Sequence, residues 1–97
     1  MSVSVLLEGT LKDGLIEQFT QTCTDGFPVT RAFDGCRNIN LTLNVKNQNN
    51  YVVTEVWDSK EQYEKYLAFR TAEGTTDAIS EMCVDGPNIQ IFDITAA

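Results

Sequence analysis

The segment from Arg37 to Lys46 constrains the fold more than any other part of the sequence. Its apolar residues alternate strictly with polar ones, which is the two-residue period of a strand buried on one face. The predicted buried face carries Ile39, Leu41, Leu43 and Val45. A polar stretch at 47–50 then predicts a hairpin loop that leads into a second strand at 51–57. The sequence therefore predicts two antiparallel strands side by side.

The elements that precede this hairpin follow from the same kind of pattern. Residues 2–8 alternate as a strand does. A helix is predicted from Gly14 or Leu15 to Thr24, because Leu15, Phe19 and Cys23 recur at helical spacing. Asp25 and Gly26 would end this helix, since glycine accepts the left-handed conformation of a helix cap. Residues 27–34, with Pro28, are expected to form a loop that closes with a turn at Asp34-Gly35.

A second helical region follows the hairpin. Ser59 and Gln62 match a capping box, so the helix is expected to begin at Ser59, and Gly74 should break it. A shorter helix, capped by Thr75 or Thr76, is predicted to end in the turn at 85–87. The last predicted strand covers residues 88–94.

The resulting order is strand, helix, strand, strand, helix, strand, the split βαββαβ unit of the ferredoxin-like α+β fold. We therefore expect one domain over residues 1–97, with a four-stranded antiparallel sheet and helices on one face. Several strands are nevertheless apolar on both faces, as at Val52 and Val56 opposite Val53 and Trp57. A face in contact with water should alternate more cleanly, so we expect a second copy of the chain to cover it in a homodimer.

Charge and cysteine content exclude several partners and sites. Fourteen acidic against seven basic residues give a net charge of −7, which disfavours nucleic acids and anionic membranes as partners. Three cysteines without a CxxC pair, in a chain without histidine, predict neither a disulfide framework nor a zinc site. Because no signal-peptide pattern and no apolar span of about 20 residues is present, we expect a cytoplasmic protein.

The residues best suited to chemistry gather where the strand at 51–57 ends. Glu55 and Trp57 share one face of that strand, and Tyr63 and Tyr66 share one face of the following helix. These aromatic residues could simply pack in the core. A carboxylate among them, however, needs either an ion pair or a cavity that admits water. The arginines available for a pair are Arg31, Arg37 and Arg70.

Three segments resemble the antibiotic biosynthesis monooxygenase (ABM) family. They are TRAFDGC at 30–36, VTEVW at 53–57 and WDSKEQYEKYL at 57–67, and the similarity in order and spacing extends over about residues 3–94. The resemblance implies a ferredoxin-like domain that pairs into a dimeric α+β barrel. It also implies a pocket between sheet and helices, lined by Glu55 and Trp57.

The resemblance implies two kinds of activity, and one residue separates this chain from the family pattern. Members include cofactor-free monooxygenases that oxidise polycyclic phenols or quinols with O₂, and relatives that bind and degrade haem. Tyr66 stands where the family most often has histidine, and without any histidine neither haem ligation of the usual kind nor a histidine base is available. We therefore expect no cofactor and no metal.

The most concrete hypothesis is a cofactor-independent monooxygenase acting on a small aromatic compound, with Trp57, Glu55 and Tyr66 as its catalytic residues. A non-catalytic ligand-binding or stress-related dimer of the same fold is the alternative. The residues expected to contact the substrate are Tyr63, Phe33, Phe19, Arg70 and Asn40.

Overall fold

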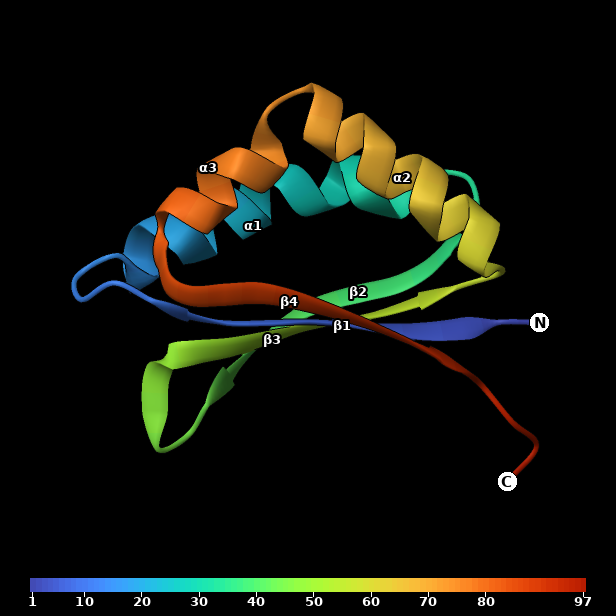
Figure 1. Ribbon diagram of the computed structural model, residues 1–97, viewed down its shortest axis with the longest axis horizontal. Coiled ribbons are helices and arrows are strands. Elements are labelled where there is room, and N and C mark those ends of the chain that lie inside the picture. The colour runs from blue at the N-terminus through green and yellow to red at the C-terminus, as the bar shows by residue number, and fades with distance from the viewer.

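Four strands form one antiparallel sheet, in the order β2-β3-β1-β4, in the computed structural model, which describes residues 1–97. The strands are β1 (Val3–Leu11), β2 (Cys36–Asn44), β3 (Asn47–Trp57) and β4 (Cys83–Asp93). The helices α1 (Ile16–Ala32), α2 (Lys60–Ala72) and α3 (Thr75–Glu81) all lie on one side of the sheet (Figure 1). The predicted ferredoxin-like βαββαβ order is confirmed, with the second helical region divided into α2 and α3.

The register of the central strands fixes which residues face the helices. Val5 of β1 lies opposite Glu55 on one neighbour and Ile91 on the other, and Ile39 of β2 also lies opposite Glu55. Alternation along β3 then turns Glu55 and Trp57 toward the helices, where both are buried. The other face of the sheet has no helix over it, and Phe92 on that face is 48% exposed.

Helix α1 is longer than the sequence predicts, and the expected end at Thr24 is wrong. The helix continues through Gly26 and Pro28 to Ala32. Pro28 lacks the N–H that would bond to the Thr24 carbonyl, which normally weakens a helix at this point. The extension places Thr30 in a fully buried position, where it meets polar side chains of α2. Contacts made by the folded protein therefore override the local preference for a break.

The hairpin between β2 and β3 turns two residues earlier than predicted. The turn is formed by Val45 and Lys46, and residues 47–50 belong to β3 instead of a loop. The Asn44 side chain accepts a hydrogen bond of 2.9 Å from the Lys46 backbone N–H, a local contact that favours a turn. Val45 is consequently 94% exposed and does not continue the buried face of β2.

The second helical region begins as predicted. The Ser59 hydroxyl accepts a hydrogen bond of 3.2 Å from the Gln62 backbone N–H and so caps α2. Gly74, with a φ of 91°, ends the α2 region and is itself the N-cap of α3, so neither Thr75 nor Thr76 is the cap. The predicted turn at 85–87 is also wrong, because these residues form an irregular part of β4 against β1.

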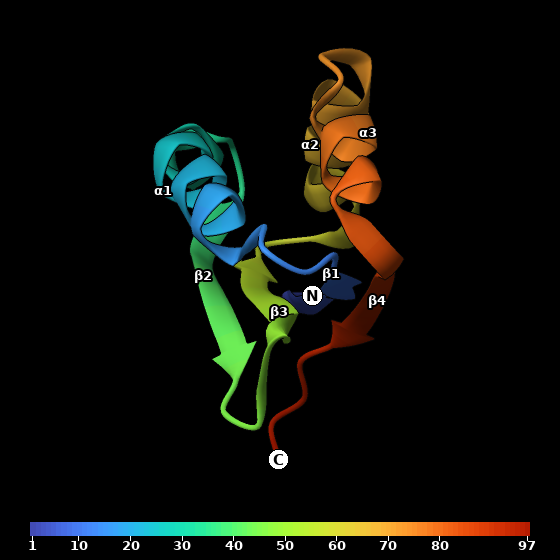
Figure 2. The ribbon, with the colours of Figure 1, turned by 90° about the vertical axis from the view of Figure 1, so that its left-hand side faces the viewer.

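The helices cover the sheet in two separate groups, α1 alone and α2 with α3, which we call the two helical supports. Figure 2 shows α1 over the β2 side of the sheet and α2 with α3 over the β4 side, with the two supports standing apart. The buried residues accordingly form two clusters. One surrounds Phe19 and Tyr51, and the other surrounds Trp57. The space between the two supports contains the candidate site.

Candidate functional site

A cavity of about 160 Å³ lies above the centre of the sheet, between α1 on one side and α2 and α3 on the other. Figure 2 shows the two helical supports that bound this region. Most of its wall is apolar, and Phe19, Ile39 and Val53 form part of it. Its size is close to that of a cavity that holds a benzene-sized molecule. The cavity therefore fits a single aromatic ring with little room to spare.

Glu55 is the carboxylate in this wall, and it is 5% exposed. None of the arginines considered in the sequence analysis pairs with it. Its Oε1 atom instead accepts a hydrogen bond of 3.0 Å from Trp57 Nε1. Burial raises the pKa of the Glu55 carboxyl to about 7, although the hydrogen bond from Trp57 lowers it in part. Glu55 can therefore accept and release a proton near neutral pH.

Trp57 lies behind the residues that line the cavity and does not line it itself, contrary to the sequence-based expectation. The indole is fully buried, and its ring centroid lies 5.0 Å from that of Tyr66 and 5.7 Å from that of Tyr63. Its N–H group is used entirely by Glu55. A ligand in the cavity would meet Glu55, Tyr63 and Tyr66 first, so Trp57 acts on a ligand through Glu55.

Tyr63 and Tyr66 both line the cavity but differ in what their hydroxyls contact. The Tyr66 hydroxyl shares a 2.7 Å hydrogen bond with the Thr30 hydroxyl and accepts another of 2.8 Å from Arg70 Nε. The Tyr63 side chain is 2% exposed, and its hydroxyl makes no hydrogen bond within the chain. Burial raises the pKa of both phenols, so neither is a base at neutral pH. The Tyr63 hydroxyl is the one free to bond a ligand.

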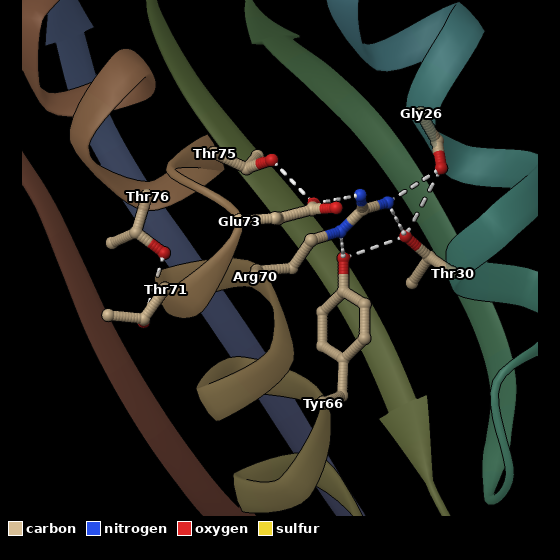
Figure 3. Close-up of polar contacts among 8 residues, drawn as sticks. All are labelled: Gly26, Thr30, Tyr66, Arg70, Thr71, Glu73, Thr75 and Thr76. Atoms are coloured by element: carbon tan, nitrogen blue, oxygen red, sulfur yellow. Dashed lines mark hydrogen bonds and ion pairs between the residues drawn. The ribbon is translucent and has the colours of Figure 1, made fainter.

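Arg70 joins the two helical supports through a network that we call the Arg70 bridge, formed by Arg70, Tyr66, Thr30, Gly26 and Glu73 (Figure 3). Its Nη2 atom donates to the Gly26 carbonyl at 2.8 Å and to the Thr30 hydroxyl at 3.1 Å. Its Nη1 atom contacts Glu73 at 2.5 Å. The guanidinium thus spans from α2 to α1 and is already engaged by protein groups.

Of the other residues predicted to contact the substrate, two line the cavity and two do not. Phe19 lines the cavity, and so does Arg70. Phe33 does not, because its ring packs against Trp57, Tyr66 and Phe69. Asn40 is exposed on the other face of the sheet, where it donates to Asn38 at 3.0 Å, so its predicted place in the site is wrong.

Several wall residues were not predicted from the sequence. Gly26 and Phe27 line the cavity because α1 continues past the point where the sequence suggested a loop. The helical spacing of Phe19, Cys23 and Phe27 was the signal that could have found them. Burial raises the pKa of the Cys23 thiol to about 11, so this wall residue stays protonated and is a weak nucleophile.

Other classes of site are absent from the structure. No group of three His, Cys, Asp or Glu side chains could hold a metal ion. The cysteines Cys23, Cys36 and Cys83 are all free. None of the three helices has the length and hydrophobicity needed to cross a bilayer.

Comparison with solved structures shows the same fold in several proteins of low sequence identity. A conserved protein from Methanosarcina mazei Go1 has a TM-score of 0.89 at 15% identity, covering 98% of this chain and 94% of that chain. Rv0793 from Mycobacterium tuberculosis has a TM-score of 0.87 at 14% identity, covering 100% and 98%. A mutant of SnoaB, a cofactor-independent oxygenase from Streptomyces nogalater, has a TM-score of 0.83 at 16% identity, covering 99% and 95%.

Sequence comparison identifies the family. A search of curated proteins found no matching relative. The model of the antibiotic biosynthesis monooxygenase family, in contrast, matches residues 2–75, which include β1, α1, the β2–β3 hairpin and α2. That range also contains Glu55 and both cavity tyrosines. The chain therefore belongs to the antibiotic biosynthesis monooxygenase family.

Proposed function

We propose that the protein is a cofactor-independent monooxygenase that oxidises a small phenol or quinol with O₂. The observation that supports this most strongly is Glu55, a carboxylate with a pKa of about 7 in the wall of an apolar cavity of single-ring size. A phenol has a pKa near 10, so its activation at neutral pH needs a nearby base whose own pKa is not too low. Glu55 is the group in this wall that meets the requirement.

The proposed reaction uses the substrate as its own reductant. Glu55 accepts the proton of the substrate hydroxyl, and the resulting phenolate is electron-rich enough to transfer an electron to O₂. Recombination forms a carbon–oxygen bond at a ring carbon that bears a hydrogen, and the peroxide takes the proton back from Glu55. The resulting ring hydroperoxide loses that ring hydrogen together with its terminal OH as water, which leaves a carbonyl at this carbon. One oxygen atom enters the product and the other leaves as water, so the substrate supplies all the electrons and no external reductant is consumed. The protein contributes a dry, oriented site and a proton acceptor.

Each polar residue near the cavity has a separate role in this proposal. Tyr63 offers its free hydroxyl to the substrate oxygen and holds it against Glu55. Trp57 keeps one Glu55 oxygen in place through the 3.0 Å hydrogen bond, which leaves the other oxygen for the substrate. Tyr66, proposed from the sequence to be catalytic, keeps the Arg70 bridge closed instead, because its hydroxyl is occupied by Thr30 and Arg70.

The test combines ligand binding with oxygen uptake. Hydroquinone should quench the fluorescence of Trp57, the sole tryptophan of the chain, and should support oxygen uptake above the uncatalysed rate without added metal or flavin. Glu55→Gln should lower the catalysed rate by about 100-fold, the contribution expected of a general base. Binding without uptake in the wild-type protein would favour the alternative, a non-catalytic binding protein. Failure of a panel of phenols and quinols to bind would overturn both.

We also infer that the open face of the sheet pairs with a second copy of the chain. Leu6, Val52 and Val56 lie there in half-buried positions, together with the exposed Phe92. A sheet face with such a group of apolar side chains is stabilised by a second sheet. Sedimentation equilibrium should give twice the chain mass at micromolar concentration, and Val56→Asp should lower it. A wild-type monomer would contradict the inference.

A further inference from the structure

A second hollow, of about 410 Å³, lies beside the cavity between α1 and α3. We call it the α1–α3 groove, and its lining includes Gln18, Thr22, Thr75, Ala78, Ile79 and Glu81. Thr22, Thr75 and Ile79 also line the cavity. The cavity and the groove therefore adjoin at these three side chains, and a molecule in one can extend toward the other.

The two sides of the cavity differ in how tightly the helices are connected. On the α1–α2 side the Arg70 bridge fastens the supports with hydrogen bonds of 2.8 Å and 3.1 Å from Arg70 to α1 (Figure 3). No hydrogen bond joins α1 to α3, and Figure 2 shows these two helices well separated at the end that faces the viewer. Because the α1–α3 groove adjoins the cavity on this side, a substituent on a ring in the cavity finds space there.

The groove is more polar than the cavity wall, and its polar groups are mostly uncharged. The Gln18 side chain is exposed and makes no hydrogen bond within the chain, so its amide can both donate and accept. The Thr22 hydroxyl donates to the backbone carbonyl of Gln18 at 2.9 Å, and the Thr75 hydroxyl donates to the Glu73 carboxylate at 2.6 Å. Both hydroxyl oxygens can still accept a hydrogen bond. Glu81 adds a negative charge that disfavours an anionic group.

We propose that the α1–α3 groove is a second subsite of the enzyme, which takes a neutral, hydroxylated substituent carried by the aromatic ring in the cavity. The inference rests on the proposed function, because the ring must first occupy the cavity. It defines the substrate class as a phenol or quinol with an uncharged polar substituent, such as a sugar. It also assigns the selection of that substituent to Gln18, Thr22, Thr75 and Glu81.

The first test compares three ligands by quenching of Trp57 fluorescence. Hydroquinone probes the cavity alone, its monoglucoside adds a neutral hydroxylated substituent, and (2,5-dihydroxyphenyl)acetate adds an anionic one. The glucoside should bind about 10-fold more tightly than hydroquinone, the gain expected from one or two additional hydrogen bonds. The anionic compound should bind more weakly than hydroquinone. Equal or weaker binding of the glucoside while hydroquinone binds would overturn the subsite and leave the proposed function standing.

The second test fills the groove without touching the cavity wall. Ala78 is exposed and lines the groove but not the cavity, so Ala78→Phe should fold normally and occupy the space of the substituent. It should abolish the roughly 10-fold advantage of the glucoside and leave hydroquinone binding within about twofold. Ala68→Phe, at an exposed position of α2 outside both hollows, is the matched control and should change neither ligand. Equal weakening of both ligands by Ala78→Phe, or retention of the glucoside's advantage, would overturn the assignment.

Discussion

Two polar clusters border the same cavity, and they differ in how completely their atoms are bonded. In the Arg70 bridge, the guanidinium contacts Tyr66, Thr30, the Gly26 carbonyl and Glu73. On the sheet below, Glu55 has one partner within the chain, Trp57. Burial raises the pKa of Glu55 to about 7, because little in the chain stabilises its charge. In the Arg70 bridge, by contrast, the charges of Arg70 and Glu73 contact each other within a hydrogen-bonded network.

This difference in bonding indicates that the Arg70 bridge mainly stabilises the fold, whereas Glu55 is available for chemistry. A network in which each group has a partner stabilises the arrangement of the helices and leaves little for a ligand to bond. A buried carboxylate with a single partner is costly to the fold and is suited to proton transfer. We therefore expect substitutions in the Arg70 bridge to affect mainly stability, and substitutions at Glu55 to affect mainly chemistry and pH dependence.

The largest effect on stability is expected from removing the centre of the bridge. Arg70→Met should lower the free energy of unfolding by about 2–4 kcal/mol, because it removes charge-assisted hydrogen bonds between α1 and α2 and takes one donor each from the Gly26 carbonyl and the Thr30 hydroxyl. Urea denaturation measures the loss. Arg37→Met is the matched control, since Arg37 contacts Asp58 on the exposed surface and its loss should have little effect. Similar losses in the two variants would show that the bridge is not a structural connection.

The next largest effect concerns how stability changes with pH. The native pKa of Glu55 lies above its ordinary value of 4.5, so the folded protein binds a proton more tightly at this group than the unfolded chain does. Its contribution to stability is therefore fully present below about pH 4.5 and is lost as the pH rises through about 7, by an amount on the order of 3 kcal/mol.

Glu55→Gln isolates this contribution, because glutamine does not titrate. The difference in unfolding free energy between wild type and variant should change with pH between about 4.5 and about 7 and be constant above that range. Chemical denaturation at several pH values measures it. A difference independent of pH would contradict a raised pKa at Glu55.

The smallest effects should separate the two tyrosines. Tyr66→Phe should cost about 1–2 kcal/mol of stability, because the Thr30 hydroxyl and Arg70 Nε lose a partner. Tyr63→Phe should change stability by less than about 0.5 kcal/mol, since its hydroxyl has no partner to lose, but should weaken hydroquinone binding about 5–10-fold. Unfolding and fluorescence titration on both variants give the comparison. The reverse pattern would mean that the roles of the two hydroxyls are exchanged.

The sequence predicted the elements better than their ends. Alternation in β2, followed by a polar stretch and a second run of strand-forming residues, predicted the hairpin, because these are local properties of the sequence. The end of α1 was missed because its last turns depend on Arg70, which lies 44 residues from Gly26 in the sequence. The Val45-Lys46 turn was missed because the alternation continues through Val45, whereas the turn depends on the hydrogen bond that the Asn44 side chain accepts from the Lys46 backbone.

For the candidate site, the sequence predicted which residues share a face but not which hydrogen bonds their side chains make. The period of β3 predicted that Glu55 and Trp57 share one face, and the family resemblance implied that this face meets the helices. The burial of Glu55 follows from its register with Val5 and Ile39. Which tyrosine keeps a free hydroxyl could not be predicted, because the answer depends on Thr30 at the end of the longer α1. Asn40 was assigned to the site although its own alternation places it on the opposite face, and the structure agrees with the alternation.

The pH dependence of the catalysed oxidation tests the role of Glu55 most directly. Oxygen uptake with hydroquinone, corrected for the uncatalysed reaction, should give a kcat/KM that rises between about pH 5.5 and about pH 8.5 with an apparent pKa near 7, the value expected when the ionised form of Glu55 is the base. In Glu55→Gln this rise should disappear and kcat/KM should be about 100-fold lower at pH 8. Retention in Glu55→Gln of both the wild-type rate and the inflection near pH 7 would contradict the assignment of Glu55 as the base.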